Sequence, residues 1–126
     1  MKKILIVDDQ VGVLRLYQEE LCDEGYDVIT AENANKAMWH VTMSGPDLVL
    51  LDLFLGGPDG WEVLERIKEE KSRLPVIVVS AYDSYRDDPR LSRAHDYVVK
   101  NLDISELKEK IALVLGSVPE HQCVSV

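Results

Sequence analysis

The chain has 126 residues, of which 46% are hydrophobic and 29% charged, a composition typical of one ordinary globular domain rather than of a disordered chain. The formal net charge is −9 and the Lys and Arg residues form no basic cluster, which argues against direct nucleic-acid binding. No apolar run approaches the ~18 residues of a membrane span, and residues 1–3 lead straight into an apolar run without the features of a signal peptide. Two isolated cysteines, Cys22 and Cys123, make no disulfide framework, so a cytoplasmic protein is expected.

Strand and helix patterns alternate along the chain. Apolar runs predict strands at residues 4–7, 26–31, 48–52, 76–80 and 96–99. Helical spacing of apolar residues follows the first, second, third and fifth of these runs; in the first helix the inner face is predicted to be Val11, Leu14, Tyr17 and Leu21. Strands that alternate with helices predict a parallel α/β sheet with helices on both faces.

The last two helical segments differ in how clearly they are marked. Asp103 with Glu106 has the spacing of a capping box at the start of the last helix, and Gly116 ends that helix. Residues 83–94 have few periodic apolar residues and contain Pro89. A helix there must therefore be short or begin near the proline.

Polar residues fall at the carboxyl ends of four predicted strands. Asp8 and Asp9 follow the first strand, Asp52 closes the third, Ser80 closes the fourth and Lys100 follows the fifth. In a parallel sheet these ends share one edge, where open α/β folds bind ligands. Taken singly each residue is weak evidence, because Asp9 could equally be the N-cap of the first helix.

Three carboxylates at one edge of a sheet need a counter-charge. Two carboxylates about 4 Å apart repel by roughly 4 kcal/mol at an effective dielectric constant near 20. Lys100 supplies one positive charge, and Mg²⁺ (or Mn²⁺) suits a site of carboxylate oxygens that also receives a phosphate. With a cation bound, Asp52 could attack a phosphoryl group and form an aspartyl-phosphate, while Lys100 and the Ser80 hydroxyl contact the phosphoryl oxygens.

The chain resembles the receiver domain of two-component response regulators over about residues 1–116. The matching segments are ILIVDD at 4–9, DLVLLDL at 47–53, DGWE at 59–62, PVIVVSA at 75–81 and AHDYVVK at 94–100. The resemblance implies a flavodoxin-like, doubly wound (βα)5 sheet with strand order 2-1-3-4-5. Residues 117–126 are expected to form a short C-terminal tail, and the domain to act alone.

The resemblance also implies a role for the acidic residues. Asp52 would accept a phosphoryl group from a sensor histidine kinase or a histidine phosphotransfer protein. Asp8, Asp9 and Asp52 would hold Mg²⁺ together with the backbone carbonyl of Phe54. The protein would then be a signalling switch in a phosphorelay, catalysing only its own phosphorylation and dephosphorylation, rather than an enzyme.

Three further residues acquire roles in the same way. Ser80 and Lys100 would contact the phosphoryl group, and Tyr97 would be the aromatic that swings inward with Ser80. Simple packing remains an alternative for a tyrosine on a short strand. The output would be a contact with a downstream protein rather than with nucleic acid or membrane, and the chain would be a monomer or a weak phosphorylation-dependent dimer.

Three departures from the family pattern lie near the predicted site. Asn101 stands where the family usually has a proline, so the Lys100–Asn101 peptide is expected to be trans. Residues 55–58, Leu-Gly-Gly-Pro, replace the usual Met-Pro pair and are expected to make a more flexible loop. The interval between Ser80 and Lys100 is slightly short, so the helix that usually binds partners is expected to be shortened or displaced.

Two aromatic residues lie close to the predicted phosphoryl site. Phe54 is two residues after Asp52, and Tyr82 is two residues after Ser80. Bulky rings there should hinder an attacking water, which predicts a long-lived aspartyl-phosphate. The alternative is that both rings simply face solvent or pack on partners.

Other functions fit the residues less well. A receiver fold that binds a partner without phosphorylation is favoured by Asn101 and Gly56, but the intact acids, Ser80 and Lys100 argue against it. Phosphohydrolases with an aspartyl-phosphate usually place a second Asp where this chain has Phe54. A flavodoxin-like FMN carrier would need a Ser/Thr/Gly-rich phosphate loop after the first strand.

Overall fold

The computed structural model describes residues 1–55, 59–101 and 103–116. The strands are β1 (Lys3–Val7), β2 (Asp27–Ala31), β3 (Leu48–Leu51), β4 (Val76–Ser80) and β5 (Asp96–Val99). The α-helices are α1 (Val11–Asp23), α2 (Ala34–Met43), α3 (Asp59–Glu70) and α4 (Ser105–Leu115), and two 3₁₀ turns are η1 (Asp83–Tyr85) and η2 (Pro89–Arg93). The predictions of a flexible loop at 56–58 and a tail at 117–126 fall outside the described residues.

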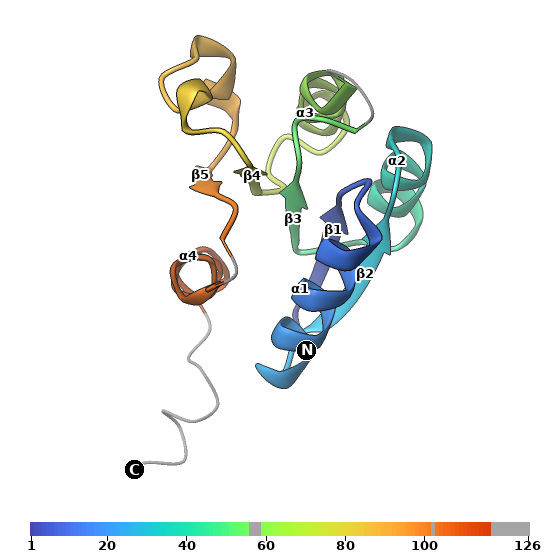
Figure 1. The fold of residues 1–126 in the computed structure, drawn as a ribbon. Coiled ribbons are helices and arrows are strands. Elements are labelled where there is room, and N and C mark those ends of the chain that lie inside the picture. The colour runs from blue at the N-terminus through green and yellow to red at the C-terminus, as the bar shows by residue number, and fades with distance from the viewer. Residues whose placement is uncertain (56–58, 102, 117–126) are drawn as a thin grey trace.

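The five strands form one parallel sheet in the order β2-β1-β3-β4-β5, which confirms the predicted flavodoxin-like α/β fold (Figure 1). Val7 pairs with both Ala31 and Leu51, and Ser80 pairs with Val99. The ends of β1, β2 and β3 are therefore in register, and β4 and β5 end together two residues further on, because Leu51 pairs with Val78. Asp8, Asp52 and Lys100, which directly follow β1, β3 and β5, are therefore brought to the same edge of the sheet.

Alternation along each strand gives the sheet two apolar faces. In β1, Ile4 and Ile6 lie in one core cluster with residues of α1 and α4, whereas Leu5 and Val7 lie in a second cluster with residues of α2 and α3. Figure 1 shows α1 and α4 on one side of the sheet and α2 and α3 on the other. Helices on both faces explain why the central strands read as unbroken apolar runs.

Two predictions about the ends of the helices are wrong. Val11 begins α1 but is 53% exposed, so it lies outside the buried face that Leu14, Tyr17 and Leu21 form. The N-cap of α4 is Ile104, and Glu106 forms an ion pair with Lys110 instead of reaching back as a capping box requires. The carboxylate of Asp103 still accepts hydrogen bonds from the Ser105 N–H and hydroxyl.

The segment between β4 and β5 contains the two 3₁₀ turns in place of an α-helix, and the second begins at Pro89, in keeping with the prediction of a helix that is short or begins near the proline. Pro89 opens η2, and the side chain of Asp88 accepts a hydrogen bond from the Arg90 N–H. Proline is well suited to a first helical position because it has no N–H to satisfy. In Figure 1 this yellow-to-orange segment lies at the same end of the sheet as the start of α3.

None of the helices in the described ranges combines the length and apolarity that crossing a bilayer requires. The described backbone also contains no cis peptide bond, so the Lys100–Asn101 peptide is trans, as predicted.

Gly60, the second residue of α3, packs against the end of β3. Its N–H donates a hydrogen bond to the Leu53 carbonyl at 3.1 Å, and a Cβ at Gly60 would overlap backbone atoms of Asp52 and Leu53. We predict that Gly60→Ala lowers the free energy of unfolding by about 1–3 kcal/mol, because backbone cannot move aside as a flexible side chain can. Urea denaturation of the parent and the variant measures this difference.

The control is Gly12→Ala in α1, where an added Cβ meets open space. Because alanine is favoured over glycine in a helix by up to about 1 kcal/mol, this variant should be as stable as the parent or more stable. Equal losses of stability in both variants would contradict the close packing of Gly60.

Candidate functional site

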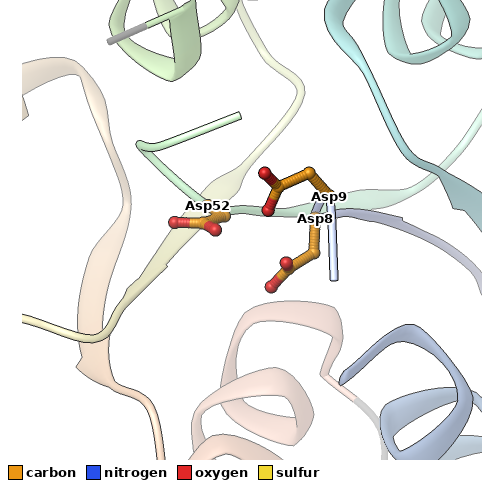
Figure 2. A group of neighbouring side chains, drawn as sticks. All are labelled: Asp8, Asp9 and Asp52. Atoms are coloured by element: carbon orange, nitrogen blue, oxygen red, sulfur yellow. The ribbon is translucent and has the colours of Figure 1, made fainter. Parts of the chain in front are cut away.

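The predicted acidic residues converge at the carboxyl edge of the sheet. Asp8 follows β1, Asp9 follows Asp8, and Asp52 directly follows β3. Each offers a carboxylate oxygen, and these three oxygens lie within 4.8 Å of one another. Figure 2 shows the three side chains directed into one shared space. Asp8 and Asp52 are buried and Asp9 is exposed, so the site opens to solvent on the Asp9 side.

Lys100 joins the two buried carboxylates. Its Nζ lies 2.7 Å from Asp8 Oδ2 and 3.1 Å from Asp52 Oδ2. Lys100 follows β5, two strands away from β3, so the ammonium must cross a gap of roughly 10 Å set by strand spacing. The long flexible stem of lysine covers this distance and brings one positive charge between two negative ones.

Backbone N–H groups fix the two buried carboxylates. The Gln10 N–H donates to Asp8 Oδ1 at 2.9 Å, and the Phe54 N–H donates to Asp52 Oδ1 at 3.1 Å. Each aspartate thus closes a tight turn onto the residue two positions later. Asp9 does not cap α1, because the N-cap position is Gln10 and no side chain caps it. Of the two roles considered for Asp9, helix N-cap or member of the acidic site, the structure favours the second.

The environment shifts the ionisation of both partners. Burial raises the pKa of Asp52 above its ordinary value, and Asp8 adds to this rise, while the Phe54 N–H and Lys100 oppose it incompletely. Burial alone would lower the pKa of Lys100, but hydrogen bonds and charges from Asp8 and Asp52 outweigh it and raise that pKa. Lys100 is therefore a permanent cation of the site, and the Asp52 carboxylate is held at an energetic cost.

The donor set fits a hard divalent cation. Three carboxylate oxygens within 4.8 Å carry more negative charge than the single ammonium of Lys100 neutralises. Mg²⁺ is bound by oxygen ligands and commonly uses one or two carboxylates. The three acids are the residues of the described chain that could hold it, and a bound cation would supply the missing positive charge.

Ser80 and Tyr97 are linked through Tyr82. Ser80 is fully buried, and its Oγ accepts a hydrogen bond from the Tyr82 N–H at 3.2 Å. Tyr97 is only 5% exposed, and its hydroxyl donates to the carbonyl of the same Tyr82. The Tyr97 ring is therefore turned into the protein, with the Arg86 guanidinium 5.4 Å from its centroid.

Aromatic residues gather beside the acidic site. The rings of Phe54 and Tyr82 meet edge to face with their centroids 5.7 Å apart. Tyr85 contacts both rings and also Trp61, and the Arg90 guanidinium stacks 3.7 Å above the Trp61 ring. No pattern in the sequence pointed to Tyr85 or Arg90. The one hint was that Tyr85 follows Tyr82 by three residues. The rings come from three separate segments, which periodicity within one segment cannot reveal.

Comparison with known proteins identifies the class. Residues 4–112 match the response regulator receiver domain family, and the chain belongs to that family. Members of this family are signalling proteins rather than conventional enzymes. Asp8, Asp9 and Asp52 therefore form the acidic site that is expected of a receiver domain.

Individual relatives place the chain more closely. It is 39% identical over 113 residues to sporulation initiation phosphotransferase F of Bacillus subtilis, covering 87% of this chain and 90% of that protein. It is 34% identical to the transcriptional regulatory protein PhoP of the same organism, of which it spans only 48%. The chain thus has nearly the length of the first relative and about half the length of the second.

Solved structures share the fold. The response regulator TrrA of Thermotoga maritima, crystallised in complex with Mg²⁺-BeF, is 40% identical and superposes with a TM-score of 0.86, covering 90% of this chain and 99% of that one. A chain from the complex of histidine kinase ThkA with TrrA is 41% identical, with a TM-score of 0.85 and coverage of 91% and 99%. A CheY-like receiver domain protein from Methanospirillum hungatei is 30% identical with a TM-score of 0.85, covering 92% and 94%.

The raised pKa of Asp52 predicts how stability depends on pH. The folded protein binds the Asp52 proton more tightly than the unfolded chain does, so the carboxyl favours folding below its unfolded pKa of ~3.9, and this benefit is lost as the pH rises through the folded pKa. At pH 7 without added metal, Asp52→Asn should therefore be more stable than the parent, on the order of 1 kcal/mol. Urea denaturation at pH 7 and pH 4 should show this gain shrinking at the lower pH.

Asp103→Asn is the matched control, because hydrogen bonds from Ser105 lower the pKa of that carboxyl instead. Its sign is opposite: the substitution should reduce stability at neutral pH, and the loss should vanish on acidification through the lowered pKa. An Asp52→Asn variant that is less stable than the parent at pH 7 would refute the predicted cost of the buried carboxylate.

Proposed function

We propose that residues 1–116 form a phospho-acceptor switch in which Asp52 receives a phosphoryl group from a sensor histidine kinase or a histidine phosphotransfer protein. The observation that carries the proposal is the buried Asp52 carboxylate, which lies 3.1 Å from Lys100 and beside two further acids. A carboxylate positioned beside fixed positive charge is the arrangement that phosphoryl transfer requires.

The transfer step conserves atoms and charge. A carboxylate oxygen of Asp52 forms a bond to phosphorus as the bond from phosphorus to the donor's histidine nitrogen breaks, and that nitrogen takes back a proton. Lys100, which already contacts Asp52 at 3.1 Å, neutralises the phosphoryl oxygens. Ser80, at the end of the adjacent strand β4, donates its hydroxyl to one of them, since Tyr82 uses only its acceptor side.

Metal binding in this proposal uses Asp8, Asp9, Asp52 and the backbone carbonyl of Phe54. Mg²⁺ or Mn²⁺ bound there supplies charge neutralisation for the transferring group. Support comes from the three converging carboxylates and from TrrA, which was crystallised with Mg²⁺-BeF.

The choice of donor is supported by relatives. TrrA was crystallised with a histidine kinase, and the sporulation relative is a phosphotransferase by name. A cytoplasmic location is part of the proposal, in keeping with the exposed thiol of Cys22, which a reducing compartment would preserve.

The output is a change in a protein-binding face, read by an unknown downstream partner, with the chain a monomer or a weak phosphorylation-dependent dimer. Tyr97 carries the signal in this proposal, because its hydroxyl and the Ser80 hydroxyl both bond to the backbone of Tyr82. Movement of Ser80 toward a phosphoryl group would be transmitted through Tyr82 to Tyr97. Phosphorylation would shift the balance between two arrangements of this linked unit.

Intact-protein mass spectrometry tests the acceptor. After incubation with acetyl phosphate and Mg²⁺, the parent should gain a single labile phosphoryl group, and neither Asp52→Asn nor the parent stripped of divalent metal should gain it. Asp103→Asn, an exposed acid outside the site, should be labelled like the parent. A parent protein that binds Mg²⁺ by calorimetry but forms no adduct would instead favour a module that binds its partner without phosphorylation.

Two side chains are proposed to control access to the phosphoryl group. The rings of Phe54 and Tyr82 pack edge to face, and their backbone N–H groups hold Asp52 and Ser80. Rings fixed next to both residues would hinder the approach of an attacking water, which makes the aspartyl-phosphate long-lived.

Phe54→Asn and Tyr82→Ala should each speed hydrolysis of the adduct, because each opens a path for water. Decay of the phosphorylated species, followed by mass spectrometry after removal of acetyl phosphate, measures the rate. Unchanged decay in both variants would show that the rings do not control access.

A further inference from the structure

Tyr85 is the one ring in the aromatic group that contacts all of the other rings. Its centroid lies 5.5 Å from that of Phe54, 6.3 Å from that of Tyr82 and 6.1 Å from that of Trp61. From these contacts we infer that Tyr85 is a positioning residue, which holds Phe54 and Tyr82 across the mouth of the site and so sets the lifetime of the phosphoryl group. The inference rests on the proposed function of Asp52.

Two of the three rings that Tyr85 contacts, Phe54 and Tyr82, are tied to the site through their backbone N–H groups. Phe54 is tied to Asp52 through its N–H, and Tyr82 is tied to Ser80 through its N–H. These bonds fix where each Cα lies, because Asp52 and Ser80 follow or end the adjacent strands β3 and β4. They leave the direction of each ring free, and Tyr82 is 56% exposed. The ring directions must therefore be set by other contacts.

Tyr85 is suited to set these directions, since it is itself held from the opposite side. It lies in η1, is half-buried, and packs against Trp61 of α3, which is only 9% exposed. The Arg90 guanidinium stacks 3.7 Å above Trp61. Cation–π stacking of this kind stabilises the position of the indole. A chain of contacts therefore runs from a buried residue of α3 through Tyr85 to the half-buried Phe54 ring and the exposed Tyr82 ring.

Edge-to-face aromatic pairs prefer defined geometries, so each contact restricts ring direction as well as position. Without the Tyr85 ring, Phe54 would lose one of its two aromatic neighbours and Tyr82 would lose one of its two. Both rings would then sample more directions, and water would reach the phosphoryl group more often. The effect should fall on hydrolysis. It should act through Phe54, because Phe54 is the ring tied to Asp52, which carries the phosphoryl group, whereas Tyr82 is tied to Ser80.

The test measures the first-order hydrolysis of the phosphorylated full chain with acetyl phosphate as the donor. Tyr85→Leu should hydrolyse about threefold to tenfold faster than the parent, the range expected for loss of an aromatic pair. Tyr85→Phe keeps the ring and should restore the parent rate. Tyr26→Leu is the matched control, because Tyr26 is also half-buried but precedes β2 at the opposite edge of the sheet, and its rate should equal that of the parent.

Phe54→Leu separates positioning from a general loss of structure. If Tyr85 acts through Phe54, the double variant Phe54→Leu/Tyr85→Leu should hydrolyse no faster than Phe54→Leu alone. Tyr85→Met, which keeps apolar volume without a ring, repeats the measurement if Tyr85→Leu does not fold. Circular dichroism melts of each variant establish that the folded protein is being compared.

Three results would overturn the inference. One is an adduct whose lifetime depends on Phe54 but not on Tyr85, and another is a double variant in which the two accelerations multiply. The third is a failure of Tyr85→Phe to restore the parent rate. Absence of any adduct in the parent would overturn the proposed function and this inference with it, so the two failures are distinguishable.

Discussion

The contact of one ammonium group with two buried carboxylates is the interaction on which the rest of the site depends. Lys100 reaches from the end of β5 to Asp8 and Asp52 at the ends of β1 and β3, so one side chain ties together strands that are not all neighbours. Buried like charges are tolerated only with a partner, and removing that partner leaves uncompensated charge. The strand order therefore matters chemically, because only a long cationic side chain can serve from this distance.

Lys100 neutralises only part of the negative charge of the site, and the remaining charge favours cation binding. Three carboxylates face one lysine, and the raised pKa of Asp52 shows that burial still disfavours its charged form. A site of this kind gains stability whenever a cation enters, because binding to the folded state alone stabilises it. The fold thus maintains a negative charge that it does not itself neutralise, as expected where function and stability conflict.

Most of the fold could be predicted from the sequence, because strands buried on both faces read as unbroken apolar runs and the alternation with helices leaves few topologies. The acidic site could be predicted as well, since Asp8 and Asp9 follow one predicted strand and Asp52 closes another. The predicted capping box failed because one local contact replaced another: Glu106 pairs with Lys110 one turn later in α4 instead of capping the helix. Tyr85 could not be assigned, because its neighbours Phe54 and Trp61 belong to other segments.

The two 3₁₀ turns between β4 and β5 make this segment the part of the molecule most prone to local unfolding. Such turns have poorer hydrogen-bond geometry than an α-helix and contribute few repeated backbone bonds, so η1 and η2 depend on side-chain stacking against α3. Regions of this kind lie at the low end of local unfolding free energies, while central strands share the global value. Amide hydrogens of residues 83–93 should thus exchange by small, frequent openings, which leave the sheet closed and concentrate conformational freedom beside the acidic site.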